Sequence, residues 1–112
     1  MLKVYDLKDK LSLKLLTNDV NLDKSVSGCY IGDLLSWVMA NAKGGDVWLT
    51  VMGNINAIAV ATLLNISCII LTDGASLDQN AKNRAIEENV PVFVTDLNSY
   101  DVAIRLSGLL KL

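Results

Sequence analysis

DVWLTVMGNINAIAVATLLNISCIIL, residues 46–71, decides the fold of this 112-residue chain. The run is apolar enough to raise the question of a membrane-spanning helix. Polar or helix-breaking residues interrupt it at two places about a dozen residues apart, around Gly53-Asn54 and around Asn65-Ser67. This spacing predicts a strand over 46–51, a helix over 55–64 and a second strand over 67–71, and it argues against a membrane span.

The same alternation continues on both sides of this segment. Val92–Thr95 follows Pro91 and reads as a third strand. Helical patterns separate the strands, and strand–helix–strand units imply right-handed crossovers and a mainly parallel sheet. We therefore predict one α/β domain over residues 1–112, with a Rossmann-like three-layer architecture and four to six strands. The other predicted elements are helices at Val4–Lys10, Asp33–Ala42, Gln79–Glu88 and Ser99–Leu110, an edge strand within Leu11–Leu16, and a short strand or turn around Ser25–Tyr30.

Two helices carry more specific expectations. The helix over 55–64 is apolar nearly all round, so it needs cover on more than its sheet side, from neighbouring helices or from a second subunit. The helix over 33–42 should bury one stripe and hold Asp33 in its first turn, where the helix dipole favours a carboxylate. Ser76 and Gln79 have capping-box spacing before the helix over 79–88. The stripe of the helix over 33–42 comprises Leu34, Leu35, Val38, Met39 and Ala42.

Composition excludes several classes of function. The net charge is −2 and the ten Lys and Arg residues are scattered, so the basic stripe of a nucleic-acid binder is missing. The chain has no histidine, which removes Ser-His-Asp and Cys-His catalysis and histidine-based zinc sites. Neither a G-x-x-x-x-G-K-[ST] loop nor a G-x-G-x-x-G turn is present. We expect no metal, no cofactor, no nucleic acid and no membrane as partners.

The two cysteines and the amino-terminal residues indicate a compartment. Cys68 lies in an apolar run and is expected to act as a small buried hydrophobe, whereas Cys29 is placed in a turn. The first fourteen residues mix charges through the apolar positions, unlike a signal peptide. Reduced thiols without an export signal predict a cytoplasmic protein.

Candidate ligand contacts follow the predicted strands. Open α/β sheets bind ligands beyond the carboxyl ends of their parallel strands. After the first strand, Gly53 would let the backbone approach a ligand, and Asn54 or Asn56 would bond it or cap the next helix. After the second, Thr72, Asp73 and Gly74 would bind a ribose or another polyol, or form an Asp-Gly turn before a Ser76 cap. Thr95-Asp96 repeats the Thr-Asp pattern after the third strand.

With these residues in view, the chain resembles a stand-alone DRTGG domain, a family related to the amino-terminal domain of HPr kinase/phosphorylase. The literal Asp-Arg-Thr-Gly-Gly signature is absent, and Thr72-Asp73-Gly74 is its nearest counterpart. Small stand-alone members have a Gln-Thr-His-Gln-like turn where this chain reads Val51-Met52-Gly53-Asn54, without the histidine. The segments that carry the resemblance are Val26–Met39, Gly45–Thr50, Asn56–Ala61, Cys68–Gly74 and Asn89–Val92.

The resemblance implies regulation or dimerisation rather than catalysis. Such domains accompany CBS-domain-regulated pyrophosphatases, phosphotransacetylase and HPr kinase, whose catalytic phosphate-binding loop lies in another domain. The leading hypothesis is a non-catalytic, cytoplasmic, homodimeric module that binds a partner protein or a small ligand such as an adenine nucleotide. The alternatives are a small enzyme that uses Asp33, Asp73 or Asp96 as acid or base on a phosphorylated metabolite, and an accessory subunit of a larger metabolic or redox complex. Trp37 and Trp48 are expected to be core or interface anchors.

Overall fold

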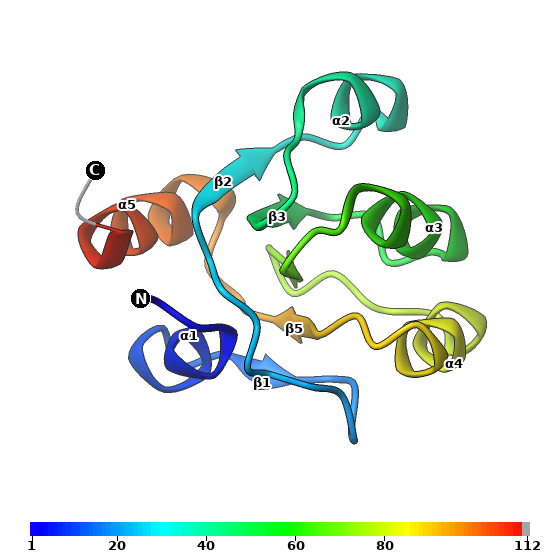
Figure 1. Ribbon diagram of the computed structural model, residues 1–112, viewed down its shortest axis with the longest axis horizontal. Coiled ribbons are helices and arrows are strands. Elements are labelled where there is room, and N and C mark those ends of the chain that lie inside the picture. Colours follow the sequence, from blue (N-terminus) through cyan, green and yellow to red (C-terminus); the bar gives the residue numbers. More distant parts are fainter. Residues whose placement is uncertain (111–112) are drawn as a thin grey trace.

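The structure, a computed structural model, describes residues 1–110 and consists of a five-stranded sheet with helices on both faces (Figure 1). The helices α1 and α5 cover one face, and α2, α3 and α4 cover the other. The elements in chain order are α1 (Val4–Lys10), β1 (Lys14–Leu15), β2 (Gly28–Ile31), α2 (Leu35–Asn41), β3 (Asp46–Thr50), α3 (Ile55–Leu64), β4 (Cys68–Leu71), α4 (Gln79–Glu87), β5 (Val92–Val94) and α5 (Ser99–Leu110).

The sheet has the strand order β1-β5-β4-β3-β2. The four strands from β2 to β5 are parallel, and β1 pairs antiparallel with β5 at one edge. The predicted α/β class and mainly parallel sheet are therefore confirmed. Helices on both faces bury β3 and β4 completely, which explains why these strands read as continuous apolar runs.

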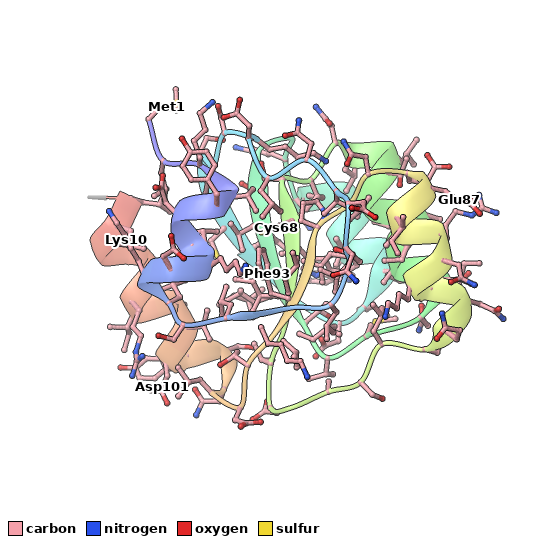
Figure 2. All side chains as sticks on the ribbon, turned by 90° about the horizontal axis from the view of Figure 1, so that it is seen from below. Met1, Lys10, Cys68, Glu87, Phe93 and Asp101 are labelled. Atoms are coloured by element: carbon pink, nitrogen blue, oxygen red, sulfur yellow. The ribbon has the colours of Figure 1, made fainter. Side chains whose placement is uncertain are left out.

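Alternate residues of the strands feed two separate cores. Trp48 and Ile69 pack toward α2, α3 and α4, whereas Val47, Ile70 and Phe93 pack toward α1 and α5. Side chains on a strand point alternately to opposite faces, so one sheet supplies both cores. Figure 2 shows Cys68 and Phe93 between the two helical layers, and Glu87 at the periphery on α4.

Helix α3 begins and ends where the sequence predicts. The Asn54 side chain caps it by accepting a hydrogen bond from the Ala57 amide at 3.0 Å, and Asn65 ends it in the left-handed conformation. The sheet and the neighbours α2 and α4 bury Ala57, Ile58, Val60 and Ala61. Ile55 and Leu63 remain exposed on its outer side. Neighbouring helices thus cover one side of this apolar helix, and five of its ten residues remain exposed.

Three local expectations are wrong. Helix α4 is capped by the carboxylate of Asp78, which accepts from the Ala81 amide at 2.8 Å, and not by Ser76. Helix α2 starts at Leu35, so Asp33 precedes it rather than lying in its first turn. Cys29 belongs to strand β2 and not to a turn.

The expected stripe of α2 is only partly buried. Val38 and Ala42 are in the core, Leu35 is half-buried, and Leu34 and Met39 are exposed. This short helix sits at the end of the sheet, beside β2, where α3 is its helical neighbour and only a narrow face can be covered.

No helix within residues 1–110 has both the length and the apolar character needed to cross a lipid bilayer.

Candidate functional site

Three polar loops meet at the carboxyl edge of the parallel strands. The Gly74 amide donates to the Thr95 carbonyl and the Asp73 amide to the Leu97 carbonyl, both at 2.9 Å, which joins the loops after β4 and β5. The Asp78 amide donates to the Gly53 carbonyl at 2.9 Å, which joins the loops after β4 and β3. The polar segments that follow the three predicted strands therefore form one continuous edge.

The loop after β3 uses its predicted residues within the fold. A Cβ at Gly53 would lie 1.9 Å from the Ser76 carbonyl oxygen, so this glycine makes room for the chain's own backbone. The Asn54 side chain caps α3. Asn56 is exposed on α3 and lines a hollow there together with Arg84 and Glu88.

The loop after β4 holds the other three predicted residues. Thr72 is buried, and its hydroxyl lies 3.1 Å from the Ser99 hydroxyl. Asp73 and Gly74 are exposed and both have positive φ, +56° and +66°, which makes the sharp turn after the strand. Gly74 lines the two hollows described below, whereas Asn56 lines the hollow on α3. The six predicted residues therefore do not share one cavity.

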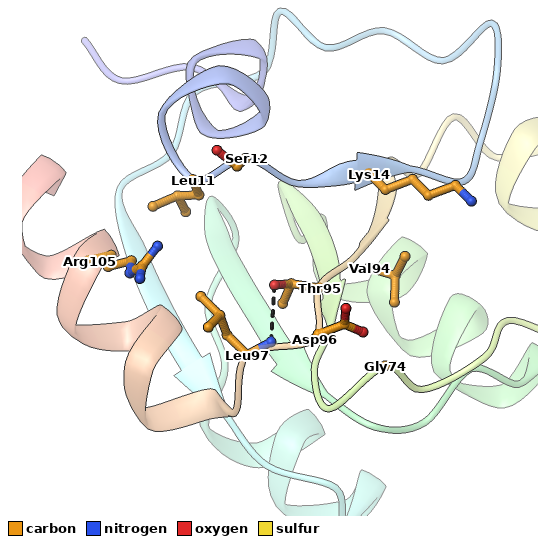
Figure 3. Close-up of a pocket in the computed structure, with 9 residues that line it drawn as sticks. All are labelled: Leu11, Ser12, Lys14, Gly74, Val94, Thr95, Asp96, Leu97 and Arg105. Atoms are coloured by element: carbon orange, nitrogen blue, oxygen red, sulfur yellow. Dashed lines mark hydrogen bonds between the residues drawn. The ribbon is translucent and has the colours of Figure 1, made fainter.

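The largest hollow at this edge, the Arg105 hollow, has a volume of about 550 Å³. Figure 3 shows Arg105 of α5 on one side of it and Lys14 of β1 on the other, with Thr95 and Asp96 between them in this view. The Thr95 hydroxyl accepts from the Leu97 amide at 3.2 Å. The lining residues are Leu11, Ser12, Lys14, Gly74, Val94, Thr95, Asp96, Leu97 and Arg105.

A second hollow, the Leu77 hollow, adjoins the first. It has a volume of about 330 Å³, and Gly74 and Val94 line both hollows. Its remaining walls come from the end of β1 and from the loop and first turns of α4. These are Leu16, Ala75, Ser76, Leu77, Gln79 and Lys82.

The Arg105 hollow has a positive balance of charge. Lys14 and Arg105 are exposed, and among residues 1–110 neither side chain forms an ion pair or a hydrogen bond. Among residues 1–110, Asp96 is the one carboxylate that lines the hollow, which leaves one net positive charge from these side chains. Such a site favours an anion. Sequence reasoning missed both cations, because the antiparallel pairing of β1 with β5 brings Lys14 opposite Val94, eighty positions later.

A separate apolar surface lies beside β2, the outermost strand on the side of the sheet opposite to β1. We call the exposed side chains of Ile31, Leu34, Trp37 and Val51 the edge patch; Trp37 is 65% exposed and Leu34 61%. The Asp33 carboxylate holds this region together, accepting from the Thr50 hydroxyl at 2.6 Å and from the Val51 amide at 3.0 Å. Trp48, in contrast, is wholly buried, and its indole donates to the Gly32 carbonyl at 2.8 Å.

The two cysteines are poor nucleophiles. Burial, helped by the nearby Asp46 carboxylate, raises the pKa of Cys29 to about 11. Complete burial raises the pKa of Cys68 as well. Cys29 on β2 and Cys68 on β4 both pair with Val47 on β3, the strand between them. Their main chains are therefore two strand spacings apart, about 10 Å. A disulfide needs a Cα separation of about 6 Å, so this backbone cannot accommodate one between them.

Within residues 1–110, no cluster of three or more carboxylate or thiol side chains is arranged to hold a metal ion.

Comparison with known proteins gives a family and a fold. A model of the DRTGG domain matches residues 6–109. No curated protein matches the chain. Among solved structures, the chain is similar to the CBS and DRTGG domains of the regulatory region of Clostridium perfringens pyrophosphatase, complexed with the activator diadenosine tetraphosphate. The TM-score is 0.70 with 15% sequence identity, and the match covers 92% of this chain and 45% of the other, so the chain spans less than half of that structure.

Proposed function

Because this chain belongs to the DRTGG domain family, we propose that it is a non-catalytic regulatory module that senses an adenine nucleotide and acts as a homodimer. The observation that carries the proposal is the positively charged hollow at the carboxyl edge, where α/β sheets bind their ligands. The similar solved structure supports the proposal, because its DRTGG domain is part of a regulatory region whose activator is diadenosine tetraphosphate, an adenine dinucleotide.

The chemistry of the side chains favours binding over catalysis. Both thiols are held in their neutral form by burial, so neither is an activated nucleophile. The Asp33 carboxylate is committed to Thr50 and Val51. No observation favours the carboxylate-dependent enzyme over a binding module. Two free cysteines suit a reducing compartment, and we place the protein in the cytoplasm.

The homodimer is proposed to form through the edge patch. Strand β2 ends the sheet, and within residues 1–110 no strand pairs with its outer side. A strand edge is self-complementary, because an antiparallel copy of the same strand satisfies its free amides and carbonyls. A second copy of β2 would continue the sheet and cover Ile31, Leu34 and Trp37, which carry no charge and so do not repel their own copies.

Thermal unfolding of the full chain with adenine nucleotides tests the sensing function. A nucleotide present at 100 times its dissociation constant stabilises the native state by about 2.7 kcal/mol. For a domain of this size the melting temperature should rise by roughly 10 °C. AMP, ADP, ATP and diadenosine tetraphosphate form the panel, with CDP as the control for the phosphates alone. The absence of any rise with the adenine panel would rule out nucleotide sensing.

A further inference from the structure

We propose that the nucleotide lies across the ridge formed by Gly74 and Val94, with its phosphates in the Arg105 hollow and its base in the Leu77 hollow. This inference rests on the proposed function and assigns the two halves of the ligand to named residues. The two hollows meet at this ridge because Gly74 and Val94 line both of them.

The chemistry of the Arg105 hollow suits a phosphate chain. Two cationic residues line it from separate elements, Lys14 from β1 and Arg105 from α5, on opposite sides of the hollow in Figure 3. A guanidinium offers a fork of donors that matches phosphate oxygens, whereas the ammonium of a lysine acts as a point charge. The hydroxyl groups of Ser12 and Thr95 are further donors in the same wall. Because neither cation has a partner among residues 1–110, binding of phosphate breaks no ion pair there.

The Leu77 hollow suits the flat ring of a base. Leu16, Ala75, Leu77 and Val94 give it an apolar wall, and half-buried Lys82 lies on its rim. Ligand sites combine apolar walls with a few polar groups that fix orientation. The two volumes, about 550 and 330 Å³, together fall in the range of sites for small ligands.

Gly74 keeps the ridge between the hollows low. Its φ of +66° disfavours any residue with a side chain, and a Cβ there would lie 3.1 Å from an Asp96 carboxylate oxygen. Gly74 therefore adds no side chain of its own to the ridge, and the Asp96 carboxylate is the group beside it.

Asp96 provides a test of whether the phosphates bind in the Arg105 hollow. Its carboxylate lines the same hollow as Lys14 and Arg105 and repels a phosphate. Asp96→Asn removes that repulsion at nearly constant volume, so it should tighten nucleotide binding. A site located elsewhere on the domain would not respond in this way.

The test is calorimetric titration of the full chain with ADP, adenosine and tripolyphosphate. Arg105→Gln and Lys14→Gln should each weaken ADP and tripolyphosphate binding about tenfold, as expected for one charge-assisted hydrogen bond. Lys43→Gln is the matched control, because this exposed lysine precedes β3 at the opposite edge of the sheet. Ala75→Leu, which fills part of the Leu77 hollow, should weaken ADP and adenosine but leave tripolyphosphate unchanged.

The outcomes separate this inference from the proposed function. ADP binding that is unaffected by Arg105→Gln, Lys14→Gln and Asp96→Asn would overturn the placement and leave nucleotide sensing standing. Tripolyphosphate binding that depends on Arg105, without binding of any adenine nucleotide, would overturn the base assignment together with the sensing function. Thermal unfolding of each variant identifies a loss of affinity that comes from misfolding.

Discussion

The Asp33 carboxylate accepts a hydrogen bond of 2.6 Å from the hydroxyl of Thr50, seventeen positions along the chain. The same oxygen accepts from the Val51 amide at 3.0 Å. These two bonds join the end of β2 to the end of β3 and hold the edge patch in place. The acidic residue expected to stabilise a helix start instead connects two strands.

Replacement of Asp33 by alanine should therefore weaken the fold. We expect a loss of about 1.5 kcal/mol in the free energy of unfolding, at the lower end for charge-assisted hydrogen bonds because the side chain is exposed. Thr50→Val should cost a similar amount, and the double variant should cost less than the sum. Urea unfolding measures all three, with Asp9→Ala on the exposed side of α1 as control. Additive losses would show that the two side chains do not stabilise each other.

Trp37→Arg should convert a homodimer into a monomer. The indole is 65% exposed in the edge patch, and a buried unpaired charge there would oppose association of two copies. Light scattering gives the mass. Trp37 fluorescence gives a local signal, because the other tryptophan, Trp48, is already buried and should not change on association. For wild-type protein we expect the emission to shift to shorter wavelength as concentration rises.

The matched control for this variant is Leu63→Arg. Leu63 is 69% exposed and lines a hollow on the α4 side of α3 together with Arg84 and Glu88, away from β2. The Leu63→Arg variant should remain dimeric. A dimer broken by Leu63→Arg and not by Trp37→Arg would place the interface on α3, and a monomeric wild type would remove the dimer altogether.

The sequence predicted the strands and helices well because their apolar patterns are local. The segment 46–71 contains two buried strands and a helix bounded by asparagine, and each boundary has a physical signal within a few residues. The site was less predictable. Gly53 and Asn54 have the residue types of a ligand loop, yet the fold uses them for close backbone approach and for a helix cap.

Lys14 and Arg105 show the limit of such reasoning. A lysine in a short edge strand and an arginine on a helix have no local pattern that connects them. They line one hollow because β1 pairs with β5 and α5 packs on the face of the sheet that α1 also covers. Long-range pairing of this kind is set by the whole fold, and it supplied the residues that determine the charge of the site.

The pKa of Cys29 predicts how stability depends on pH. An unfolded thiol has a pKa of about 8.5, whereas burial raises that of Cys29 to about 11 in the native state. Between these values the unfolded chain releases the proton and the native chain retains it, so stability should fall as pH rises from about 9 toward 11. Below about pH 8 both states hold the proton and this contribution should not vary. Urea unfolding at pH 8 and pH 10 should show a smaller pH effect in Cys29→Ala than in wild type, and an equal effect would contradict the assignment.

Two glycine-to-alanine substitutions should change stability in opposite directions. At Gly53 the new Cβ would lie 1.9 Å from the Ser76 carbonyl oxygen and 2.8 Å from its carbonyl carbon, so backbone must move. We expect Gly53→Ala to cost about 3 kcal/mol, the upper part of the range for overpacking. At Gly108, inside α5, a Cβ meets no atom of residues 1–110 within 4 Å, and alanine should stabilise the helix by about 0.5–1 kcal/mol. Thermal and urea unfolding measure both.

Because Gly53 contacts the loop that carries Ala75 and Ser76, Gly53→Ala should also weaken the binding of any ligand held in the Leu77 hollow, whereas Gly108→Ala should leave its affinity unchanged. A stable, fully binding Gly53→Ala variant would contradict the close packing of the loops after β3 and β4, on which the shape of that hollow depends.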